Sequence, residues 1–150
     1  MEKKIVQVQE RTQQLIRQLL NVWESSVRAT HDFLSEEEII KIREYVPMAI
    51  ENVEYLIIAE KEFGEPVAFM GIDSNRLEML FLSPEVRGKG FGKQLLQYGI
   101  ETYNIQELTV NEQNPQAVGF YEHMGFQTYK RTEYDEEGNP YPLLYMRLSR

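Results

Sequence analysis

The stretch SPEVRGKGFGKQLL, residues 83–96, decides the interpretation of this sequence. It opens with Ser-Pro, places Gly88, Gly90 and Gly92 among basic residues, and then takes on the apolar spacing of a helix. Glycine permits positive φ angles and lets a ligand approach the backbone without a Cβ atom in the way. The first amides of a helix lack internal partners, and the helix dipole favours negative charge there. The stretch is therefore typical of a phosphate site.

The spacing of the glycines narrows the kind of phosphate compound. Gly88, Gly90 and Gly92 give G-x-G-x-G, which differs from the G-x-G-x-x-G of dinucleotide sites, and no Gly-Lys-Ser/Thr sequence marks a nucleoside triphosphate loop. Arg87 and Lys89 add two positive charges to the loop. The alternative is a turn from strand to helix that uses glycine for its geometry alone.

Composition bounds the remaining possibilities. A chain of 150 residues with 42% hydrophobic content predicts one domain, residues 1–150, with a buried core. No apolar run reaches the roughly 18 residues of a membrane span, and the start MEKKIVQVQERTQQ lacks the apolar segment of a signal peptide, so we expect a cytoplasmic protein without a membrane partner. The chain has no cysteine and only two histidines, so we expect no metal site. Its net charge of −8 disfavours nucleic acid as a partner.

The hydrophobic pattern predicts the element order. A short strand over 5–8 precedes a helix over 15–27 and a second helix, which starts at a Ser35–Glu38 capping box and is kinked or split at Pro47. Strands over 55–60, 66–72 and 76–82 form an antiparallel meander. A helix over 91–102, a strand over 107–110 and a helix between Asn114 and Gly125 follow. Strands over 126–134 and 141–148 flank DEEGNP and form a terminal hairpin.

Two spaced motifs and this element order resemble the GNAT family of N-acetyltransferases. Arg87, Gly90 and Gly92 match the family's acyl-CoA motif, and NEQNPQAVGFYEHMGF is similar to its second motif, so that the resemblance covers residues 77–126. It implies an α+β fold in three layers, in which helices flank a central, mixed and mostly antiparallel sheet. It also implies acetyl-CoA as cosubstrate, without a metal. The amino-terminal third of the chain departs most from the family's pattern. In this family the residues that recognise the acceptor usually differ in that region.

The resemblance also implies which residues contact acetyl-CoA. Its pyrophosphate is expected on the glycine-rich loop and its pantetheine arm beside the strand over 76–82, where an amide near Leu82 would polarise the thioester carbonyl. Asn114 caps a helix and would also border the arm. The expected cofactor-binding residues are Leu80, Phe81, Leu82, Arg87, Gly88, Lys89, Gly90, Phe91, Gly92, Lys93 and Asn114.

Three residues are candidates for catalysis. By resemblance Tyr121 is the general acid, because a phenol keeps its proton at neutral pH; the alternative is a packed helix residue. The base is Glu78 or His31. Glu78 alternates with apolar neighbours on its strand, and the alternative is a solvent-facing or ion-paired side chain. His31 lies between the first two helices, where the alternative is a local hydrogen-bonding role. His123 is expected at the surface and Trp23 in the core.

Two classes of function remain open. One is an N-acetyltransferase that moves the acetyl group to a primary amine by direct attack, since no cysteine exists to form an acyl-enzyme. The net negative charge of the chain favours a small cationic acceptor through electrostatic attraction, with peptide and protein amines as alternatives. The other class is a noncatalytic acyl-CoA-binding sensor or interaction module. The terminal hairpin offers a surface for a homodimer.

Overall fold

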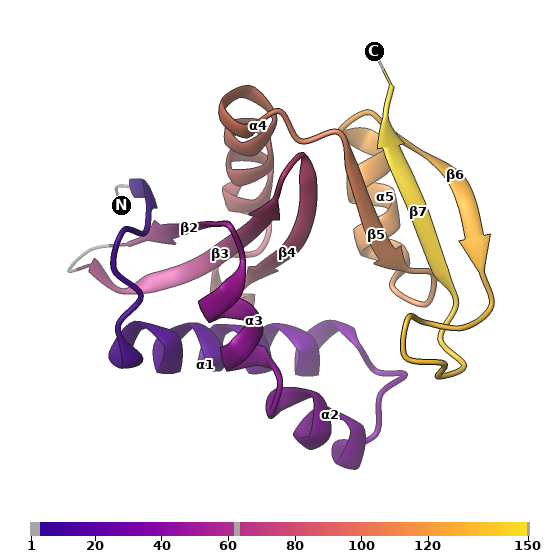
Figure 1. Ribbon diagram of the computed structural model, residues 1–150, viewed down its shortest axis with the longest axis horizontal. Coiled ribbons are helices and arrows are strands. Elements are labelled where there is room, and N and C mark those ends of the chain that lie inside the picture. The colour runs from indigo at the N-terminus through magenta and orange to yellow at the C-terminus, as the bar shows by residue number, and fades with distance from the viewer. Residues whose placement is uncertain (1–3, 62–63, 150) are drawn as a thin grey trace.

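The computed structural model describes residues 4–61 and 64–149 (Figure 1). Its elements follow the expected order. The elements are β1 Lys4–Gln7, α1 Gln13–Thr30, α2 Glu36–Arg43, α3 Val46–Asn52, β2 Tyr55–Glu60, β3 Pro66–Asp73, β4 Arg76–Leu82, the 3₁₀ turn η2 Pro84–Val86, α4 Phe91–Tyr103, β5 Glu107–Asn111, α5 Pro115–His123, β6 Phe126–Thr132 and β7 Leu143–Leu148.

The strands form one seven-stranded sheet in the order β1-β2-β3-β4-β5-β7-β6. Every neighbouring pair is antiparallel except β4 and β5, which run parallel. The predicted meander of β2, β3 and β4 and the predicted hairpin of β6 and β7 are both present. The expectation of a mixed, mostly antiparallel sheet is confirmed.

The parallel pair is the feature that shapes the site. Only two Cα pairs join β4 to β5, Arg76 with Glu107 and Leu77 with Leu108, although β4 continues to Leu82. Beyond these pairs the two strands separate, and the sheet opens into two wings (Figure 1). We call this point of divergence the fork.

Two apolar clusters hold helices to opposite faces of the sheet. On one face α1, α2 and α3 pack on Leu56, Ile58 and Phe69. On the other face α4 and α5 pack on Ile57, Met70 and further buried residues. Alternate residues of β2 thus enter different clusters, as the two-residue period of a strand requires. The expected three layers are present.

The residues predicted to mark helix ends do so in the structure. Ser35 and Glu38 form a complete capping box at the start of α2. Pro47 occupies the first turn of α3, and the predicted helix is split into α2 and α3 just before it. The Asn114 side chain accepts from the amide of Ala117, 3.3 Å away, at the start of α5.

The terminal hairpin is shorter than the sequence pattern predicts. The strand expected over 126–134 ends at Thr132, and the one expected from 141 begins at Leu143. The Asp135 carboxylate accepts from the amides of Glu137 and Asn139, at 3.0 and 2.8 Å. These side-chain bonds form a turn that replaces the last strand pairings.

Candidate active site

The glycine loop has the geometry expected of an anion cradle. Gly88 and Gly90 adopt φ values of +76° and +85°, which side chains rarely allow. Gly90 is the N-cap of α4 and offers no side chain to the first amides of the helix. Gly92 is buried at ordinary φ, and a Cβ atom there would lie 3.5 Å from Leu82 Cδ2. The loop thus places the amides of Gly88 and Gly90 beside a helix N-terminus.

The edge of β4 beyond the fork exposes backbone groups. The Ser83 amide donates to the Val67 carbonyl directly opposite on the β3 side. Bonded and non-bonded pairs alternate in an antiparallel ladder, so Phe81 bonds to β3, whereas the N–H and C=O groups of Leu80 and Leu82 point away from it. They point to the side from which β5 has diverged. An extended, amide-bearing ligand would satisfy them.

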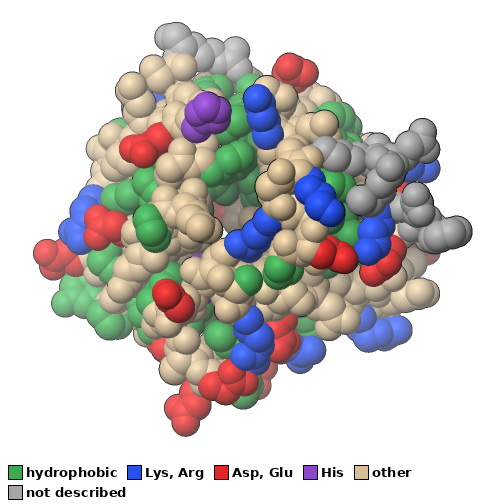
Figure 2. Space-filling model, turned by 180° about the vertical axis from the view of Figure 1, so that it is seen from behind, with side chains coloured by type: hydrophobic (Ala, Val, Ile, Leu, Met, Phe, Trp, Pro, Cys, Tyr) green, Lys and Arg blue, Asp and Glu red, His purple; other side chains and the backbone are tan. Residues whose placement is uncertain are grey.

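A groove of about 340 Å³ joins the glycine loop to this edge. Figure 2 shows a hollow near the middle of the face opposite that of Figure 1, with hydrophobic side chains inside it and Lys and Arg side chains beside it. The groove is lined by Ser26, Thr30, His31, Leu80, Phe81, Leu82, Arg87, Gly88, Gly90, Phe91, Gly92, Lys93, Asn114, Gln116, Ala117, Phe120 and Tyr121.

Nearly all the predicted cofactor residues therefore meet in one groove. Lys89 is the one that does not line it; it is exposed in the loop. Sequence reasoning missed Ser26, Thr30 and Phe120. Ser26 and Thr30 are one turn apart on α1 and carry no motif, so only the packing of α1 against the loop reveals them.

Arg87 is anchored from α1. Its Nη2 donates to Ser26 Oγ at 3.1 Å and lies 3.4 Å from the Ser26 carbonyl. Partial burial lowers the pKa of Arg87, because the charged guanidinium loses water. Ser26 is a buried polar residue, and this bond supplies its partner. The pair ties the loop to α1 and orients the cation at the groove.

Tyr121 lies in the groove wall on α5. Its side chain is 9% exposed and contacts the rings of Phe120 and Phe126. Burial raises the pKa of Tyr121, since the phenolate would lose its hydration. The hydroxyl therefore keeps its proton at every physiological pH and can donate it.

A second cavity of about 610 Å³ lies on the α1–α2 side of the fork. His31 and Phe81 line both cavities, so the two meet there. Five acidic side chains face two basic ones in the wall of the second cavity. The acidic residues are Glu38, Glu78, Asp135, Glu136 and Glu137, and the basic ones are Lys41 and Arg76.

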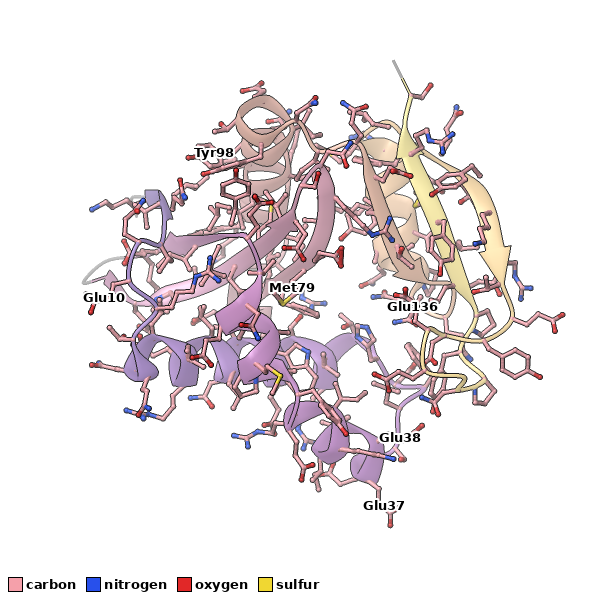
Figure 3. All side chains as sticks on the ribbon, viewed as in Figure 1. Glu10, Glu37, Glu38, Met79, Tyr98 and Glu136 are labelled. Carbon is pink, nitrogen blue, oxygen red and sulfur yellow. The ribbon has the colours of Figure 1, made fainter. Side chains whose placement is uncertain are left out.

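One wall of the second cavity joins segments that are far apart in the chain. Figure 3 shows Glu38 on α2 and Glu136 on the connection between β6 and β7. The Tyr141 hydroxyl donates to the Glu38 carboxylate, which raises the pKa of Tyr141 to about 12 and lowers that of Glu38. The Tyr141 ring lies 5.6 Å from that of Phe33. Sequence reasoning missed this wall because no local pattern links α2 with the terminal hairpin.

His31 is the C-cap of α1, and its hydrogen bonds define its tautomer. The Thr30 hydroxyl donates its one proton to the Ser26 carbonyl, 2.8 Å away. His31 Nδ1 lies 2.8 Å from Thr30 Oγ1 and must therefore donate to it. Nε2 then carries a lone pair. Burial and the nearby Arg87 lower the pKa of His31, against a smaller opposing effect of Asp32, which favours the neutral imidazole.

Glu78 lies next to the fork on β4. Partial burial raises the pKa of this carboxyl, although Arg76 Nε lies 3.3 Å from Oε1 and opposes the rise. The Asp73 and Glu136 carboxylates add to the rise. The predicted ion-paired alternative is thus present, but the residue also lines the second cavity. Trp23 packs in the core as expected and contributes to the same wall.

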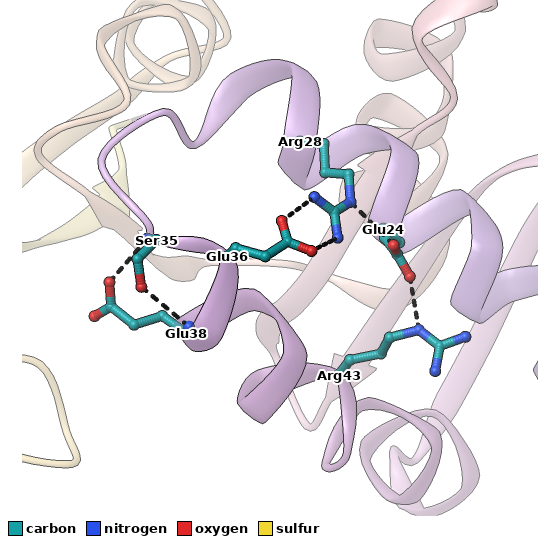
Figure 4. A network of polar contacts seen from close by, with 6 residues as sticks. All are labelled: Glu24, Arg28, Ser35, Glu36, Glu38 and Arg43. Atoms are coloured by element: carbon teal, nitrogen blue, oxygen red, sulfur yellow. Dashed lines mark hydrogen bonds and ion pairs between the residues drawn. The ribbon is translucent and has the colours of Figure 1, made fainter.

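An ion-pair network fixes α2 against α1 and thereby the second cavity (Figure 4). Arg28 donates to Glu36 at 2.6 and 2.8 Å and to Glu24 at 3.0 Å. Arg43 donates to the other oxygen of Glu24 at 2.6 Å. Each pair is exposed and contributes little alone, but the shared carboxylate of Glu24 joins the two helices.

Comparison with known proteins identifies the family. The family model of the acetyltransferase (GNAT) domain matches residues 24–148. The chain belongs to the GNAT acetyltransferases. This GNAT enzyme is 42% identical over 126 residues to the peptidyl-lysine N-acetyltransferase YjaB of Salmonella typhimurium. The match covers 84% of this chain and 86% of the relative. It is 40% identical over 127 residues to YjaB of Escherichia coli, with 85% and 86% covered.

Solved structures agree with this assignment. The solution structure of apo YjaB from Escherichia coli matches with a TM-score of 0.88 at 36% identity, covering 98% of this chain and 97% of that one. The PaiA N-acetyltransferase of Thermoplasma acidophilum, solved with coenzyme A, matches with a TM-score of 0.71 at 22% identity, covering 98% and 99%, and so shares the fold.

Over 4–61 and 64–149, no cluster of three or more His, Asp or Glu side chains is placed to hold a metal ion. Within the same ranges, none of the helices has the length and hydrophobicity of a membrane span.

Proposed function

We propose that this GNAT enzyme transfers the acetyl group of acetyl-CoA to the side-chain amine of a lysine in a peptide or protein. One observation carries the proposal: a groove with a glycine cradle and an unpaired strand edge meets an acidic cavity at His31 and Phe81. The groove suits a diphosphate with an amide-bearing arm. The acidic cavity suits a cation that enters from the other side.

The residues present fit acetyl-CoA. The amides at Gly88 and Gly90 and the Arg87 guanidinium would hold the diphosphate. The peptide groups of Leu80 and Leu82 would pair with the arm as a neighbouring strand does. Since the arm leaves the loop and runs along β4 toward the fork, its thioester end would lie near these amides. The sequence suggested Leu82 for the oxyanion; Leu80 offers a second amide closer to the fork.

The transfer needs a base and an acid on opposite sides of the thioester. The lysine amine is protonated at neutral pH, with an ordinary pKa of about 10.4, so it must first lose a proton. His31 Nε2 would accept that proton, and the freed lone pair would form the N–C bond as the C–S bond breaks. Tyr121 would donate its proton to the departing thiolate. We favour His31 over Glu78 because His31 borders both cavities.

The acceptor class rests on two kinds of support. The cavity holds more carboxylates than cations, which favours an amine. The relatives that are 40 and 42% identical are named peptidyl-lysine N-acetyltransferases. Together they favour a lysine side chain over the small cationic molecule that composition alone suggested.

Mass spectrometry of lysine peptides tests this function. The enzyme and acetyl-CoA are incubated with a peptide that has one lysine and a blocked amino terminus, and spermidine and glycine serve as competing acceptors. A mass increase of one acetyl group on the lysine, with one thiol released per acetyl, is expected. Acetylation of spermidine alone would contradict the proposed acceptor class.

Replacing Tyr121 tests the acid. In Tyr121→Phe the ring and its packing remain, but no proton is available for the thiolate, so kcat should fall by about 10²-fold or more. Acetyl-CoA affinity, measured by calorimetry, should stay within about threefold of wild type. Tyr134→Phe, at an exposed tyrosine, is the matched control and should retain full activity. An undiminished kcat in Tyr121→Phe would assign the residue to packing.

A further inference from the structure

Three apolar side chains lead out of the second cavity along α2 and α3. Ile42 and Tyr45 line the cavity, and Met48 follows Tyr45 by three residues. The Tyr45 amide donates to the Ile42 carbonyl and the Ala49 amide to the Tyr45 carbonyl, so the helical winding continues from α2 into α3. Residues three or four apart on a helix lie side by side. We call Ile42, Tyr45 and Met48 the apolar stripe.

The apolar stripe is open to solvent although its side chains are large. Ile42 is 37% exposed, Tyr45 59% and Met48 63%. Single exposed apolar residues are ordinary in folded proteins, but neighbouring ones mark surfaces where other molecules bind. Tyrosine and methionine are enriched at protein interfaces, because the rigid ring loses little entropy on binding and the flexible thioether adapts to its partner. The stripe thus has the exposure and composition of a docking surface.

The position of the apolar stripe indicates which partner it fits. Its inner end lies in the wall of the second cavity, where carboxylates outnumber cations and a lysine ammonium would enter. Its outer residue, Met48, does not line the cavity. A small amine would occupy the cavity without reaching Met48, whereas a polypeptide that inserts a lysine must continue across the surface outside. The stripe therefore fits side chains near the acceptor lysine in a polypeptide.

Helix geometry sets where this contact would fall in the acceptor. Glu38 lies in the cavity wall one turn before Ile42. A helix rises about 1.5 Å per residue, so Tyr45 and Met48 lie roughly 10 and 15 Å along the helix from Glu38. An extended peptide covers about 3.3 Å per residue, so these lengths correspond to about three to five residues.

We propose that Ile42, Tyr45 and Met48 dock an apolar side chain of the acceptor polypeptide about three to five residues from its lysine. This inference rests on the proposed function and deepens it by adding a sequence preference to the acceptor class. A lysine with a leucine or an aromatic residue at that separation is then acetylated in preference to a lysine in polar surroundings. The acidic cavity recognises the charge, and the stripe distinguishes one lysine from another.

Pairs of peptides that differ at one residue test the docking surface. Each peptide has a blocked amino terminus and one lysine among glycine and serine, with either leucine or serine three to five residues from the lysine on one side. In wild type, kcat/KM should be about tenfold higher for the leucine peptide at one or more positions, the effect of partial burial of a leucine side chain. In Tyr45→Ser/Met48→Ser this ratio should fall to within about twofold. The thermal midpoint should stay near that of wild type, because both side chains are exposed.

Ile40→Ser is the matched control. Ile40 is 51% exposed on the same helix, but it precedes Ile42 by two residues, so it lies on a different side of α2 and does not line the cavity. Its ratio of leucine to serine peptide should equal that of wild type. A wild-type ratio near one at every position would overturn the docking surface and leave the proposed function intact.

Two further measurements cover the other outcomes. Sedimentation should give the same mass for wild type and Tyr45→Ser/Met48→Ser; a wild-type dimer that the double variant dissociates would assign the stripe to a second copy of this chain and overturn the proposal. Absence of turnover on every peptide would contradict the function, and binding then decides the surface. With CoA present, calorimetry should show the leucine peptide binding about tenfold more tightly than the serine peptide in wild type, and equally in the double variant. Equal binding of both peptides by wild type would overturn the surface.

Discussion

In His31→Asn we expect kcat/KM for the lysine peptide to fall by about 10²- to 10⁴-fold at neutral pH, the range of general base catalysis. The asparagine amide can still donate to Thr30 in place of Nδ1, so the end of α1 keeps its hydrogen bond. What is removed is the Nε2 lone pair. The loss should appear in turnover, while calorimetry of acetyl-CoA binding stays close to wild type.

The pH profile gives a second measurement of the same residue. Burial lowers the pKa of His31, so the imidazole stays neutral as pH falls through its ordinary value of about 6.5 and becomes protonated only at lower pH. The acid limb of kcat/KM that belongs to His31 should therefore lie below about 6.5, and His31→Asn should lack it. His123→Asn, at the exposed histidine of α5, is the control and should keep both rate and profile. A variant at His31 with wild-type rate would transfer the base role to Glu78.

Gly88→Val should weaken acetyl-CoA binding by about a hundredfold, or about 2.7 kcal/mol. A side chain at Gly88 would meet no protein atom within 4 Å, so it would extend into the space proposed for the diphosphate. The positive φ of +76° adds strain of about 1–2 kcal/mol to the fold. Calorimetry with acetyl-CoA and a thermal unfolding curve measure the two effects separately.

Gly138→Val is a matched control for that strain. Gly138 has φ of +84°, and a Cβ atom there would likewise have no neighbour within 4 Å, but it lies in the terminal hairpin and does not line the groove. Both variants should lose similar stability, and only Gly88→Val should lose acetyl-CoA affinity. Equal affinity in the two variants would mean that the glycine loop serves turn geometry alone.

Sequence patterns predicted the fold because its decisive signals are local. The capping box at Ser35, the proline at position 47 and the Asn114 cap each act within one helical turn, and the structure contains all three. The short runs of β2, β3 and β4 likewise predict strands locally, because they are rich in β-forming residues and are bounded by turn residues. The terminal hairpin was predicted too long because the Asp135 side chain competes with strand pairing.

The sequence predicted one part of the candidate site and missed another. The residues around the glycine loop were found because their spacing forms a motif, and most of them line one groove. Tyr141 and Ser26 carry no such signal. Their roles arise from contacts between residues distant in the chain, such as Tyr141 with Glu38 and Arg87 with Ser26.

The sequence by itself determined which segments become helices and strands, and that a glycine-rich loop precedes α4, because caps, periods and φ preferences depend on neighbouring residues. Only the tertiary structure decided where β4 leaves β5 and how two cavities meet at His31. These depend on the register of β4 against β5 and on the packing of α1 against the sheet. Such features belong to the packed chain, since no short segment contains all the atoms that define them.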